Sequence, residues 1–503
     1  MNWPLAACRL RTAARHSITP LILLVVGAAF AQSPHTGAKN QSPRTTQLAE
    51  ATVDALLVSD IHFEPFFDPA KVAQLAAAPS TEWKAILAAP ASPDHQQRFQ
   101  ALQQSCHVGT EDTSFPLFDS SLKAMRSHAA NAKFVTVSGD LLTHGFDCKY
   151  NALLPKSTPA DYRSFVRKTL AYVMDELYGA FPGVPVYIAL GNNDSDCGDY
   201  RLDPQSEFLR VTGTEVAKGL PAAERHAAGE SFAAGGYYSV PLPAPIQNAR
   251  LLVLDDLFMS KNYATCAGKA DPAGADAQIA WLTHELAEAH ASKQKIWVVG
   301  HIPPGVDLYS TMKKMGDLCG DQKPGMFLSS EKMADVLANS GDVVELAIFA
   351  HTHMDEMRLL KDDGHPAAST NSVAVKMVSS ISPNHGNNPS FTVAQIDPAS
   401  AALVDYRVFT ASNQTGVDAK WTEEYDFARS YHETVFSSAS LSRLITSFAA
   451  DPSAKNKASQ SYISDFSAGS SSLVLQMFWP QYVCTLGNHT AEAFKKCVCP
   501  ATH

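Results

Sequence analysis

Five short apolar segments of this chain each end at a cluster of His, Asp or Asn residues, and this pattern constrains the fold more than any other feature. In chain order, the segments and their clusters are Val53–Val58 with Ser59–His62, Phe134–Val137 with Ser138–Asp140, Val186–Leu190 with Gly191–Asp194, Ile296–Val299 with Gly300–His301, and Val343–Phe349 with Ala350–His353. Runs of this length, rich in Val, Ile and Leu, are typical of buried strands. In open α/β sheets, ligands gather beyond the carboxyl ends of the strands. The five segments therefore predict one polar site at which the strand ends converge.

The residue types in these clusters are those of a metal site. Carboxylates, imidazoles and an amide offer oxygen and nitrogen donors without thiolate, a set that suits borderline divalent ions. We expect two ions, with zinc favoured and manganese or iron as alternatives, because two ions about 3.5–4 Å apart clamp both oxygens of an in-line phosphoryl displacement. The predicted donors are Asp60, His62, Asp140, Asn192, His301, His351 and His353.

The N-terminal residues predict export. Arg9, Arg11 and Arg15 precede the apolar stretch Leu21–Val26, and Ala29-Phe30-Ala31 is a small-x-small cleavage site. Residues 1–31 thus have the organisation of a signal peptide, and residues 32–50 that of a disordered leader. The apolar run is shorter than the roughly 20 residues of a membrane span, and no later stretch is long enough. We expect a soluble protein that is secreted or periplasmic.

The charge of the chain argues against one class of partner. The formal net charge is −10 at pH 7, and cleavage of the signal peptide would remove arginines but no acidic residue. An acidic protein repels a phosphate backbone unless a basic groove overcomes the repulsion, and no Lys/Arg cluster of that kind is present. We therefore expect no nucleic-acid polymer as a partner. The sequence does not indicate an oligomeric state.

The cysteines fit an oxidising compartment. One of the nine lies in the signal peptide, and the even number that remains favours disulfides in an exported protein. A zinc site at Cys497-x-Cys499 lacks the usual ligand spacing. The remaining cysteines, whose pairing the sequence leaves open, are Cys106, Cys148, Cys197, Cys266, Cys319, Cys484, Cys497 and Cys499.

The 503 residues are too many for one ordinary core and suggest two or more domains. Residues 51–410 alternate strand-like runs with expected helices at Phe118–Ala130, Tyr162–Tyr178 and Gln278–Ala291. They end in three expected consecutive antiparallel strands, at Ser372–Ser379, Ser390–Ile396 and Ala402–Phe409. Residues 411–503 are expected to form a mostly α-helical, cysteine-containing subdomain, with helices at Trp421–Ala428, Tyr431–Phe448 and Ser459–Phe466.

The ordered clusters resemble the calcineurin-like metallophosphoesterase superfamily, whose signature is D-x-H, G-D, G-N-H-[DE], G-H and G-H-x-H. The segment Gly300-His301-Ile302-Pro303-Pro304-Gly305 resembles the acid sphingomyelinase-like phosphodiesterase branch, as do Gly235–Tyr238 and Asn388–Phe391. The resemblance covers nearly the whole mature chain. It implies an α/β fold in which a β-sandwich is flanked by helices, with a C-terminal mostly α-helical subdomain.

The resemblance also implies how the site is divided. One ion would take Asp60, His62 and His353, the other would take Asn192, His301 and His351, and Asp140 would bridge them. The family's reaction is hydrolysis of a phosphoester by a metal-bridging hydroxide without a covalent intermediate.

Two positions depart from the signature. Asn193 stands where the family has the His credited with acting on the scissile phosphate or leaving group, and an amide cannot be a general acid. Ala350 stands where Gly is usual, which is mild if the backbone there avoids positive φ. His144, four residues after Asp140, resembles the second His of acid sphingomyelinases and is the candidate proton donor.

Weaker candidates surround the donors. Asp194 is expected to hold the Asn192 loop, since Asp folds back onto local backbone. Asp355 is a candidate for orienting a metal-binding imidazole. His385, in a later turn, is a candidate for reaching the substrate.

Three functions remain open at this point. The first is an exported phosphodiesterase acting on a small phosphoester or a phospholipid, as the resemblance implies. The second is hydrolysis of polyphosphate or nucleotide phosphoanhydrides, whose good leaving groups make the missing acid at Asn193 less costly. The third is a non-catalytic, metal-dependent protein that binds a phosphorylated ligand, against which the retention of all seven donors argues.

Overall fold

The computed structural model describes residues 52–312, 318–361, 372–469 and 472–499. The predicted signal peptide and leader lie outside the described residues. The predicted boundary at residues 410 and 411 stays a prediction.

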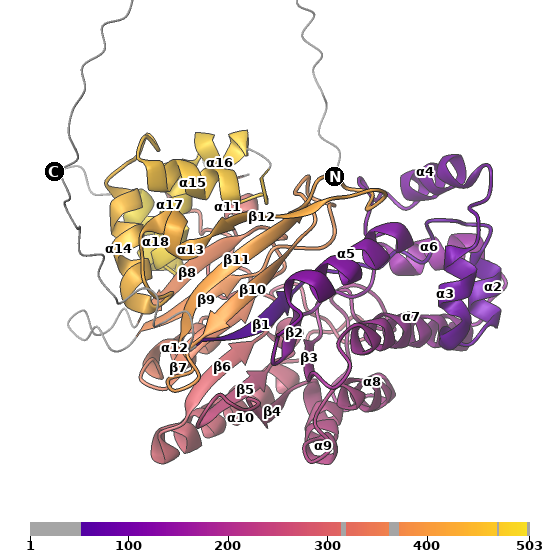
Figure 1. Ribbon diagram of the computed structural model, residues 1–503, viewed down its shortest axis with the longest axis horizontal. Coiled ribbons are helices and arrows are strands. Elements are labelled where there is room, and N and C mark those ends of the chain that lie inside the picture. The colour runs from indigo at the N-terminus through magenta and orange to yellow at the C-terminus, as the bar shows by residue number, and fades with distance from the viewer. Residues whose placement is uncertain (1–51, 313–317, 362–371, 470–471, 500–503) are drawn as a thin grey trace, which may run out of the picture. The chain divides into compact units, whose positions relative to one another are not determined.

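In the described part of the chain, the strands form two six-stranded mixed sheets (Figure 1). The first has the order β12-β11-β10-β1-β2-β3 and the second the order β4-β5-β6-β7-β9-β8. The strands are β1 (Val53–Val58), β2 (Val135–Ser138), β3 (Val186–Ala189), β4 (Tyr238–Pro241), β5 (Ala249–Val253), β6 (Lys295–Val299), β7 (Val344–Phe349), β8 (Glu356–Lys361), β9 (Ser372–Met377), β10 (Ser390–Ile396), β11 (Leu403–Ala411) and β12 (Trp421–Asp426). All five apolar segments of the sequence therefore form strands, as predicted.

The two sheets pack face to face around a shared core. Phe134, just before β2, meets the edge of Trp297 of β6 with ring centroids 5.7 Å apart. Trp297 also donates its indole N–H to the carbonyl of Ala401 at 2.8 Å. Both aromatic side chains are fully buried, so the interface between the sheets is the centre of the hydrophobic core.

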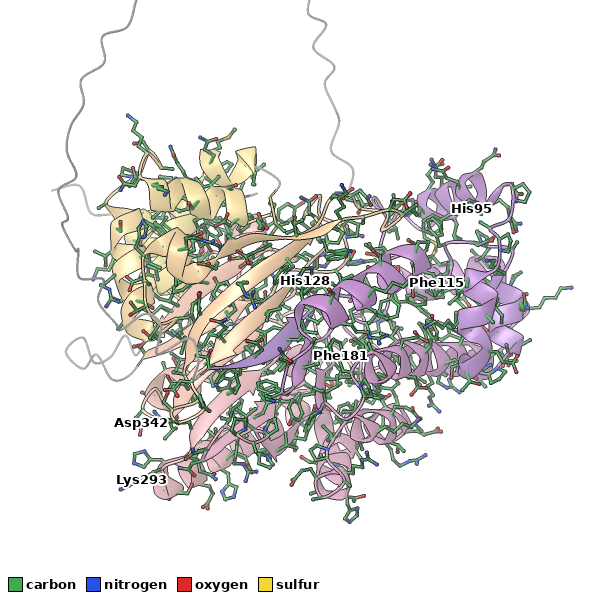
Figure 2. All side chains as sticks on the ribbon, in the orientation of Figure 1. His95, Phe115, His128, Phe181, Lys293 and Asp342 are labelled. Carbon is green, nitrogen blue, oxygen red and sulfur yellow. A yellow bond between two sulfur atoms is a disulfide. The ribbon has the colours of Figure 1, made fainter. Side chains whose placement is uncertain are left out.

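Helices cover the outer faces of this sandwich (Figure 1). Helix α5 lies over the first sheet, where His128 at its end stacks on Phe409 of β11 at 4.2 Å (Figure 2). Helices α10 and α12 and the C-terminal helices contact the second sheet. The helices are α2 (Val72–Ala77), α3 (Trp83–Ala88), α4 (His95–Ser105), α5 (Phe115–His128), α6 (Phe146–Leu153), α7 (Pro159–Ala180), α8 (Glu207–Lys218), α9 (Arg225–Gly235), α10 (Ala273–Ser292), α11 (Leu308–Met312), α12 (Lys332–Asn339), α13 (Phe427–Tyr431), α14 (Ser438–Ala449), α15 (Lys457–Asp465), α16 (Leu473–Met477), α17 (Trp479–Gly487) and α18 (Ala491–Val498). The predicted α/β sandwich flanked by helices, with a helical C-terminal region, is confirmed.

The three helices predicted in residues 51–410 are present as α5, α7 and α10, each beginning a few residues early. The start of α7 shows why. Thr158 and Asp161 form a capping box, and Pro159 occupies the first turn, where its missing N–H costs nothing.

The helix expected at Trp421–Ala428 is wrong. Residues Trp421–Asp426 form strand β12, which pairs antiparallel with β11, and helix α13 begins only at Phe427. Trp421 packs its ring against Phe391 of β10 at 5.4 Å and donates to the Ser120 hydroxyl at 3.0 Å. Phe391 and Ser120 lie far from Trp421 in the sequence. Packing against such distant residues decides strand formation more than local propensity does.

The expected run of three consecutive antiparallel strands is also wrong in one respect. β10 and β11 pair antiparallel in the first sheet, but β9 lies in the second sheet, parallel to β7. The segment between β9 and β10 therefore crosses from one sheet to the other. Its backbone N–H groups at Ile381 and Ser382 bond the carbonyls of Ser59 and Asp60 at 3.2 and 3.1 Å, so the crossing passes beside the strand ends.

The eight cysteines predicted to form disulfides are all paired. The bridges are Cys106–Cys148, Cys197–Cys266, Cys319–Cys499 and Cys484–Cys497. Because Cys497 and Cys499 each lie in a bridge, a zinc site at that pair is excluded. Among the described residues, no helix is long and apolar enough to cross a membrane.

Candidate metal centre

The seven predicted donors lie together at the carboxyl ends of strands from both sheets. β1, β2 and β3 of the first sheet lead into Asp60, His62, Asp140 and Asn192, and β6 and β7 of the second lead into the three remaining histidines. Strands β6 and β7 begin at the other end of the sheet, near Lys293 and Asp342 (Figure 2). The parallel arrangement of these strands brings together donors that lie almost 300 residues apart in the sequence.

The backbone at the donors is held in an unusual conformation. Five of them have positive φ angles: Asp60 (44°), His62 (43°), Asp140 (56°), His351 (72°) and His353 (66°). A left-handed conformation costs a non-glycine residue roughly 1–2 kcal/mol, and such strain clusters at functional sites. Ala350 is not among the positive-φ residues, so its methyl group in place of the usual glycine is tolerated.

Glycines allow the strand ends to approach closely. At Gly191 a Cβ atom would lie 2.1 Å from Oδ1 of Asp140, and at Gly139 it would lie 2.9 Å from Nδ1 of His301. Neither position accepts a side chain without moving a donor.

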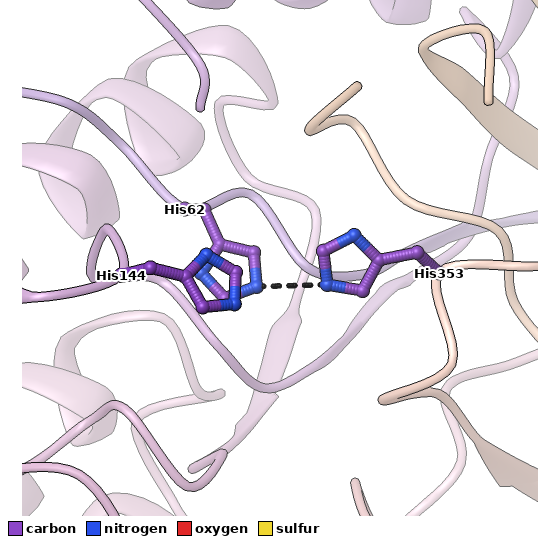
Figure 3. A group of neighbouring side chains, drawn as sticks. All are labelled: His62, His144 and His353. Carbon is purple, nitrogen blue, oxygen red and sulfur yellow. Dashed lines mark hydrogen bonds between the residues drawn. The ribbon is translucent and has the colours of Figure 1, made fainter. Parts of the chain in front are cut away.

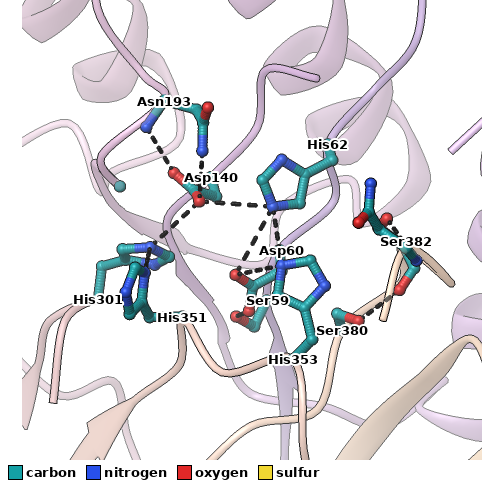
Figure 4. Close-up of polar contacts among 12 residues, drawn as sticks. Ser59, Asp60, His62, Asp140, Asn193, His301, His351, His353, Ser380 and Ser382 are labelled. Carbon is teal, nitrogen blue, oxygen red and sulfur yellow. Dashed lines mark hydrogen bonds and ion pairs between the residues drawn. The ribbon is translucent and has the colours of Figure 1, made fainter. Parts of the chain in front are cut away.

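The first group of donor atoms comes from Asp60, His62 and His353 (Figure 4). Nε2 of His62 faces Nε2 of His353 at 3.1 Å (Figure 3) and Oδ1 of Asp60 at 3.8 Å. Nε2 of His353 lies 3.6 Å from the same carboxylate oxygen. All three side chains are buried.

The second group comes from Asn192, His301 and His351. Nε2 of His301 lies 3.1 Å from Oδ1 of Asn192 and 3.3 Å from Nδ1 of His351. Asn192 and His301 are buried, and His351 is half-buried.

Asp140 joins the two groups through one atom. Its Oδ2 lies 3.4 Å from Nε2 of His62 and 3.2 Å from Nε2 of His301. Asn193 holds this carboxylate from the side, donating its backbone N–H to Oδ1 at 2.8 Å and its side-chain amide to Oδ2 at 2.9 Å (Figure 4). The side chain that replaces the family's histidine thus contacts the shared donor.

The hydrogen bonds around the donors leave lone pairs facing one another. Nδ1 of His62 donates to the carbonyl of Leu142 at 2.8 Å, and Nδ1 of His301 donates to that of Ser138 at 2.7 Å. In the neutral ring of His62, Nε2 then carries a lone pair, which faces Nε2 of His353 and the carboxylate oxygens of Asp60 and Asp140. Oδ1 of Asp60 is buried and has no hydrogen-bond partner among the described residues. Opposed lone pairs and an orphaned carboxylate oxygen are what bound cations would satisfy, so the residues fit two divalent ions.

The electrostatics of the site agree with this fit. Burial lowers the pKa of His62 to about 4 and that of His351 to about 3, which keeps both rings neutral and able to bind a metal. Burial by itself would also lower the pKa of His301, but the Asp140 carboxylate raises it to about 10. Burial raises the pKa of Asp60 to about 7. The carboxylates favour positive charge at the centre of the group.

His144 lies beside the first group, stacked on the His62 ring at 4.1 Å (Figure 3). Its Nδ1 lies 3.0 and 3.1 Å from the two carboxylate oxygens of Asp112. Nε2 is therefore the ring nitrogen that Asp112 does not contact. Burial by itself would lower its pKa, but the Asp112 carboxylate raises it to about 9. The His144 side chain is 30% exposed, so it borders the donors and also reaches solvent.

His385 also lies at this edge, with its ring 4.4 Å from that of His353. It is exposed, in the segment that crosses between the sheets. The structure therefore brings His385 next to the first group.

Carboxylates behind the donors brace the loops. Oδ1 of Asp194 accepts the backbone N–H groups of Leu141 and Leu142 at 2.8 and 3.0 Å, and its Oδ2 accepts that of Gly191 at 2.9 Å. Asp194 thus ties the Asp140 loop to the Asn192 loop. Asp355 was expected to orient a metal-binding imidazole. In the structure its buried carboxylate pairs with Lys376 instead.

Three supporting residues are not among those predicted from the sequence. Asp112 holds His144, Asp256 accepts the backbone N–H groups of His301 and Ile302, and Asp199 accepts from the Asn192 amide. A signal existed for Asp256, which follows the apolar strand β5 as the donors follow theirs. Asp112 and Asp199 lie in loops without such a signal.

Comparisons with known proteins agree with this geometry. A family model described as calcineurin-like phosphoesterase matches residues 55–355, a stretch that contains all seven donors. The chain is 25% identical to sphingomyelinase phosphodiesterase C of Dictyostelium discoideum over 62% of this chain and 66% of that protein. It is 24% identical to acid sphingomyelinase-like phosphodiesterase 3b of Homo sapiens over 77% and 80% of the two chains. It is 26% identical to cyclic GMP-AMP phosphodiesterase SMPDL3A of Mus musculus over 67% and 71%. The match thus spans just under two thirds of the Dictyostelium relative.

Proposed function

We propose that this chain, which belongs to the calcineurin-like phosphoesterase family, is an exported phosphodiesterase that works with two divalent metal ions. The observation that carries the proposal is the pair of donor groups sharing Oδ2 of Asp140. Asp60, His62 and His353 would hold one ion, and Asn192, His301 and His351 the other. Zinc is favoured by the mixed nitrogen and oxygen donors without thiolate, and manganese and iron are the alternatives.

When bound, two such ions lower the pKa of water, polarise the phosphoryl group and hold the attacking and leaving oxygens in line. The residues of the chain supply the remaining parts. Asp140 keeps the two ion sites at a fixed separation, and Asn193 and Asp194 brace the loops that carry the donors.

His144 is the proposed proton donor to the leaving group. Asp112 orients its ring and favours its protonated form, and the stacking on His62 places it at the edge of the donor cluster. An imidazolium held in this way suits general-acid work on an alkoxide leaving group.

Phosphodiesters are the favoured substrate class because the relatives are named sphingomyelinase phosphodiesterase, acid sphingomyelinase-like phosphodiesterase and cyclic GMP-AMP phosphodiesterase. A small phosphoester and a phospholipid both remain candidates. One observation favours phosphoanhydrides as a second class: the Asn193 side-chain amide donates a hydrogen bond to Asp140 and, as an amide, cannot act as a general acid. A phosphate leaving group needs less protonation than an alkoxide.

A non-catalytic phospholigand-binding protein is the third candidate. All seven donors are present and brought together, which supports catalysis over this alternative. The four disulfides support an oxidising compartment, and hence secretion or a periplasmic location.

A substrate screen tests the proposal. The purified protein would be assayed on a phosphomonoester, a phosphodiester, a phospholipid and a polyphosphate, with metal content measured on the same sample. We expect two ions per chain and the highest kcat/KM on a phosphodiester. A higher kcat/KM on polyphosphate would select the second class, and two ions without hydrolysis would select the binding protein.

A matched pair of variants controls the screen. His351→Ala removes a proposed donor, whereas His290→Ala removes an exposed histidine of α10. The first should lose activity and metal, and the second should lose neither.

A further inference from the structure

A loop that contributes no donor contacts two of the donors in the second group. This segment, Cys197–Asp203, follows the Asn192 cluster and is called the tethered loop below. Oδ1 of Asp199 accepts from Nδ2 of Asn192 at 2.8 Å. The Tyr200 hydroxyl lies 3.3 Å from Nε2 of His351, and the Tyr200 backbone N–H bonds the Asn192 carbonyl at 2.9 Å.

The contact with Asp199 decides which end of the Asn192 amide faces the donors. An amide has an oxygen that binds cations and a nitrogen that repels them. A carboxylate only accepts hydrogen bonds, so Asp199 takes the amide nitrogen and turns Oδ1 of Asn192 toward His301. Without Asp199, the amide would lose the contact that distinguishes its two orientations.

The contact with Tyr200 likewise decides which nitrogen of the His351 ring faces the other donors. Nδ1 of His351 faces Nε2 of His301 at 3.3 Å, so Nδ1 is its donor atom. A neutral imidazole carries one hydrogen, and a hydroxyl oxygen at Nε2 holds that hydrogen away from Nδ1. The ring also meets Tyr200 edge-on, at 6.3 Å between centroids.

The loop is held from its far side by the segment at residues 262–266. The disulfide Cys197–Cys266 joins the two. Backbone hydrogen bonds run from Leu202 to Ala264 at 3.1 Å and from Ala264 to Tyr200 at 3.0 Å. The backbone N–H of Cys266 also bonds Oδ1 of Asp203 at 2.9 Å. A short irregular segment is therefore kept at a fixed distance from Asn192 and His351.

We infer that Asp199 and Tyr200 are positioning residues that set the affinity of the second ion site, and that the Cys197–Cys266 bridge keeps them in place. The inference rests on the proposed dinuclear function. It concerns one of the two ions only, because the tethered loop contacts Asn192 and His351 and the first group is oriented by other partners. Loss of these contacts weakens the second ion and leaves the first unchanged.

Metal binding, measured without substrate, tests this inference. Apo-protein would be titrated with zinc against a chromophoric chelator, and the two stepwise affinities compared among wild type, Asp199→Ala and Asp199→Asn. Outer partners of metal ligands contribute roughly 10–100-fold in affinity, so Asp199→Ala should weaken one of the two stepwise affinities by that factor and leave the other unchanged. Asp199→Asn keeps an acceptor oxygen for the Asn192 amide and should lose much less. Equal losses in the two variants would overturn the role in orientation.

A double-mutant cycle assigns the effect to the second site. In a His351→Ala background, which lacks a donor of that site, Asp199→Ala should have little further effect. An undiminished effect in that background would contradict the inference. Tyr200→Phe removes only the hydroxyl and should weaken the same ion while leaving the far-ultraviolet circular dichroism spectrum unchanged.

The bridge has a matched control elsewhere in the chain. Replacing Cys197 and Cys266 by serine should weaken the second ion, whereas replacing Cys484 and Cys497, whose bridge lies in the C-terminal region, should not. Two ions bound equally well by wild type and Asp199→Ala would overturn the inference alone. A wild-type protein that binds fewer than two ions would overturn the proposed dinuclear function itself.

Discussion

The two donor groups share Asp140 but are built differently. The first contains a carboxylate of its own, Asp60, and two imidazoles, all of them buried. The second has only a neutral amide and two imidazoles besides the shared carboxylate, and His351 is half-buried. The first group also has His144 and His385 beside it, whereas the second contacts the tethered loop.

This difference leads us to expect that the two proposed ions are bound with different affinities. Negative charge and burial favour the ion in the first group, since Coulomb attraction strengthens as the dielectric constant falls. In the second group, we propose that the exposed residue Asp199 sets the orientation of the Asn192 amide. The following predictions test this contrast between the two donor groups, starting with a substitution that should disrupt both groups.

Asp140→Asn should have the largest effect because it removes charge from the atom that both groups share. We expect both ions to be lost and activity to fall by more than the roughly 10²–10⁴-fold that one proton donor contributes. Elemental analysis and kcat/KM on a phosphodiester measure this. Near wild-type activity would eliminate the bridging role.

His144→Ala should affect only the chemistry beside the first group. An alkyl phosphodiester should be hydrolysed about 10²–10⁴-fold more slowly, whereas an activated nitrophenyl ester, whose leaving group needs little protonation, should change little. Both ions should remain bound. Asn193→His in this background should recover part of the loss if the two positions share one role, and equal slowing of both esters would show that His144 is not the acid.

Removal of metal should separate the two groups in time. In excess chelator we expect metal to dissociate in two phases, with the ion of the second group leaving roughly 10-fold faster. Changes in the residues that orient metal ligands have effects of about this size. His351→Ala should abolish the fast phase and His353→Ala the slow one. A single phase carrying both ions would contradict the contrast between the groups.

The smallest effect concerns the helices behind His353. Asp355 bonds the Phe466 carbonyl through its backbone N–H at 2.9 Å, so the end of α15 supports the turn that carries His353. There, burial raises the pKa of Asp465 from 3.8 to about 7, and the charge of Asp355 adds to the shift. An acid whose pKa is raised by folding stabilises the folded state most at pH values below its unfolded pKa, here near 4. This stabilisation is lost as the pH rises through the folded pKa of about 7.

Asp465→Asn removes this titration while keeping an acceptor for the Tyr431 hydroxyl. We expect its melting temperature to exceed that of wild type at pH 8 by about 2 °C and to match it near pH 4. Differential scanning calorimetry measures this, with the exposed Asp418→Asn as control. A difference that is the same at both pH values would show that the carboxyl does not titrate as stated.

Much of the site followed from the sequence because its information is local. Each donor stands directly after an apolar run, and the geometry of parallel strands then requires that the ends of neighbouring strands meet. The even number of cysteines likewise predicted disulfides but not their pairing, which depends on where distant loops come to lie.

The sequence failed where packing between distant segments decides the outcome. Trp421–Asp426 forms a strand because β11 and Phe391 offer it partners, and β9 belongs to the second sheet because it pairs with β7 and β8 there. The same is true of Asp112 and Asp199, whose roles arise only when their loops meet His144 and Asn192. The sequence by itself determined which residues can donate to a metal and at which strand ends they stand. Only the tertiary structure decided which carboxylates orient them, because a hydrogen bond depends on the final position of both partners and no local pattern records it.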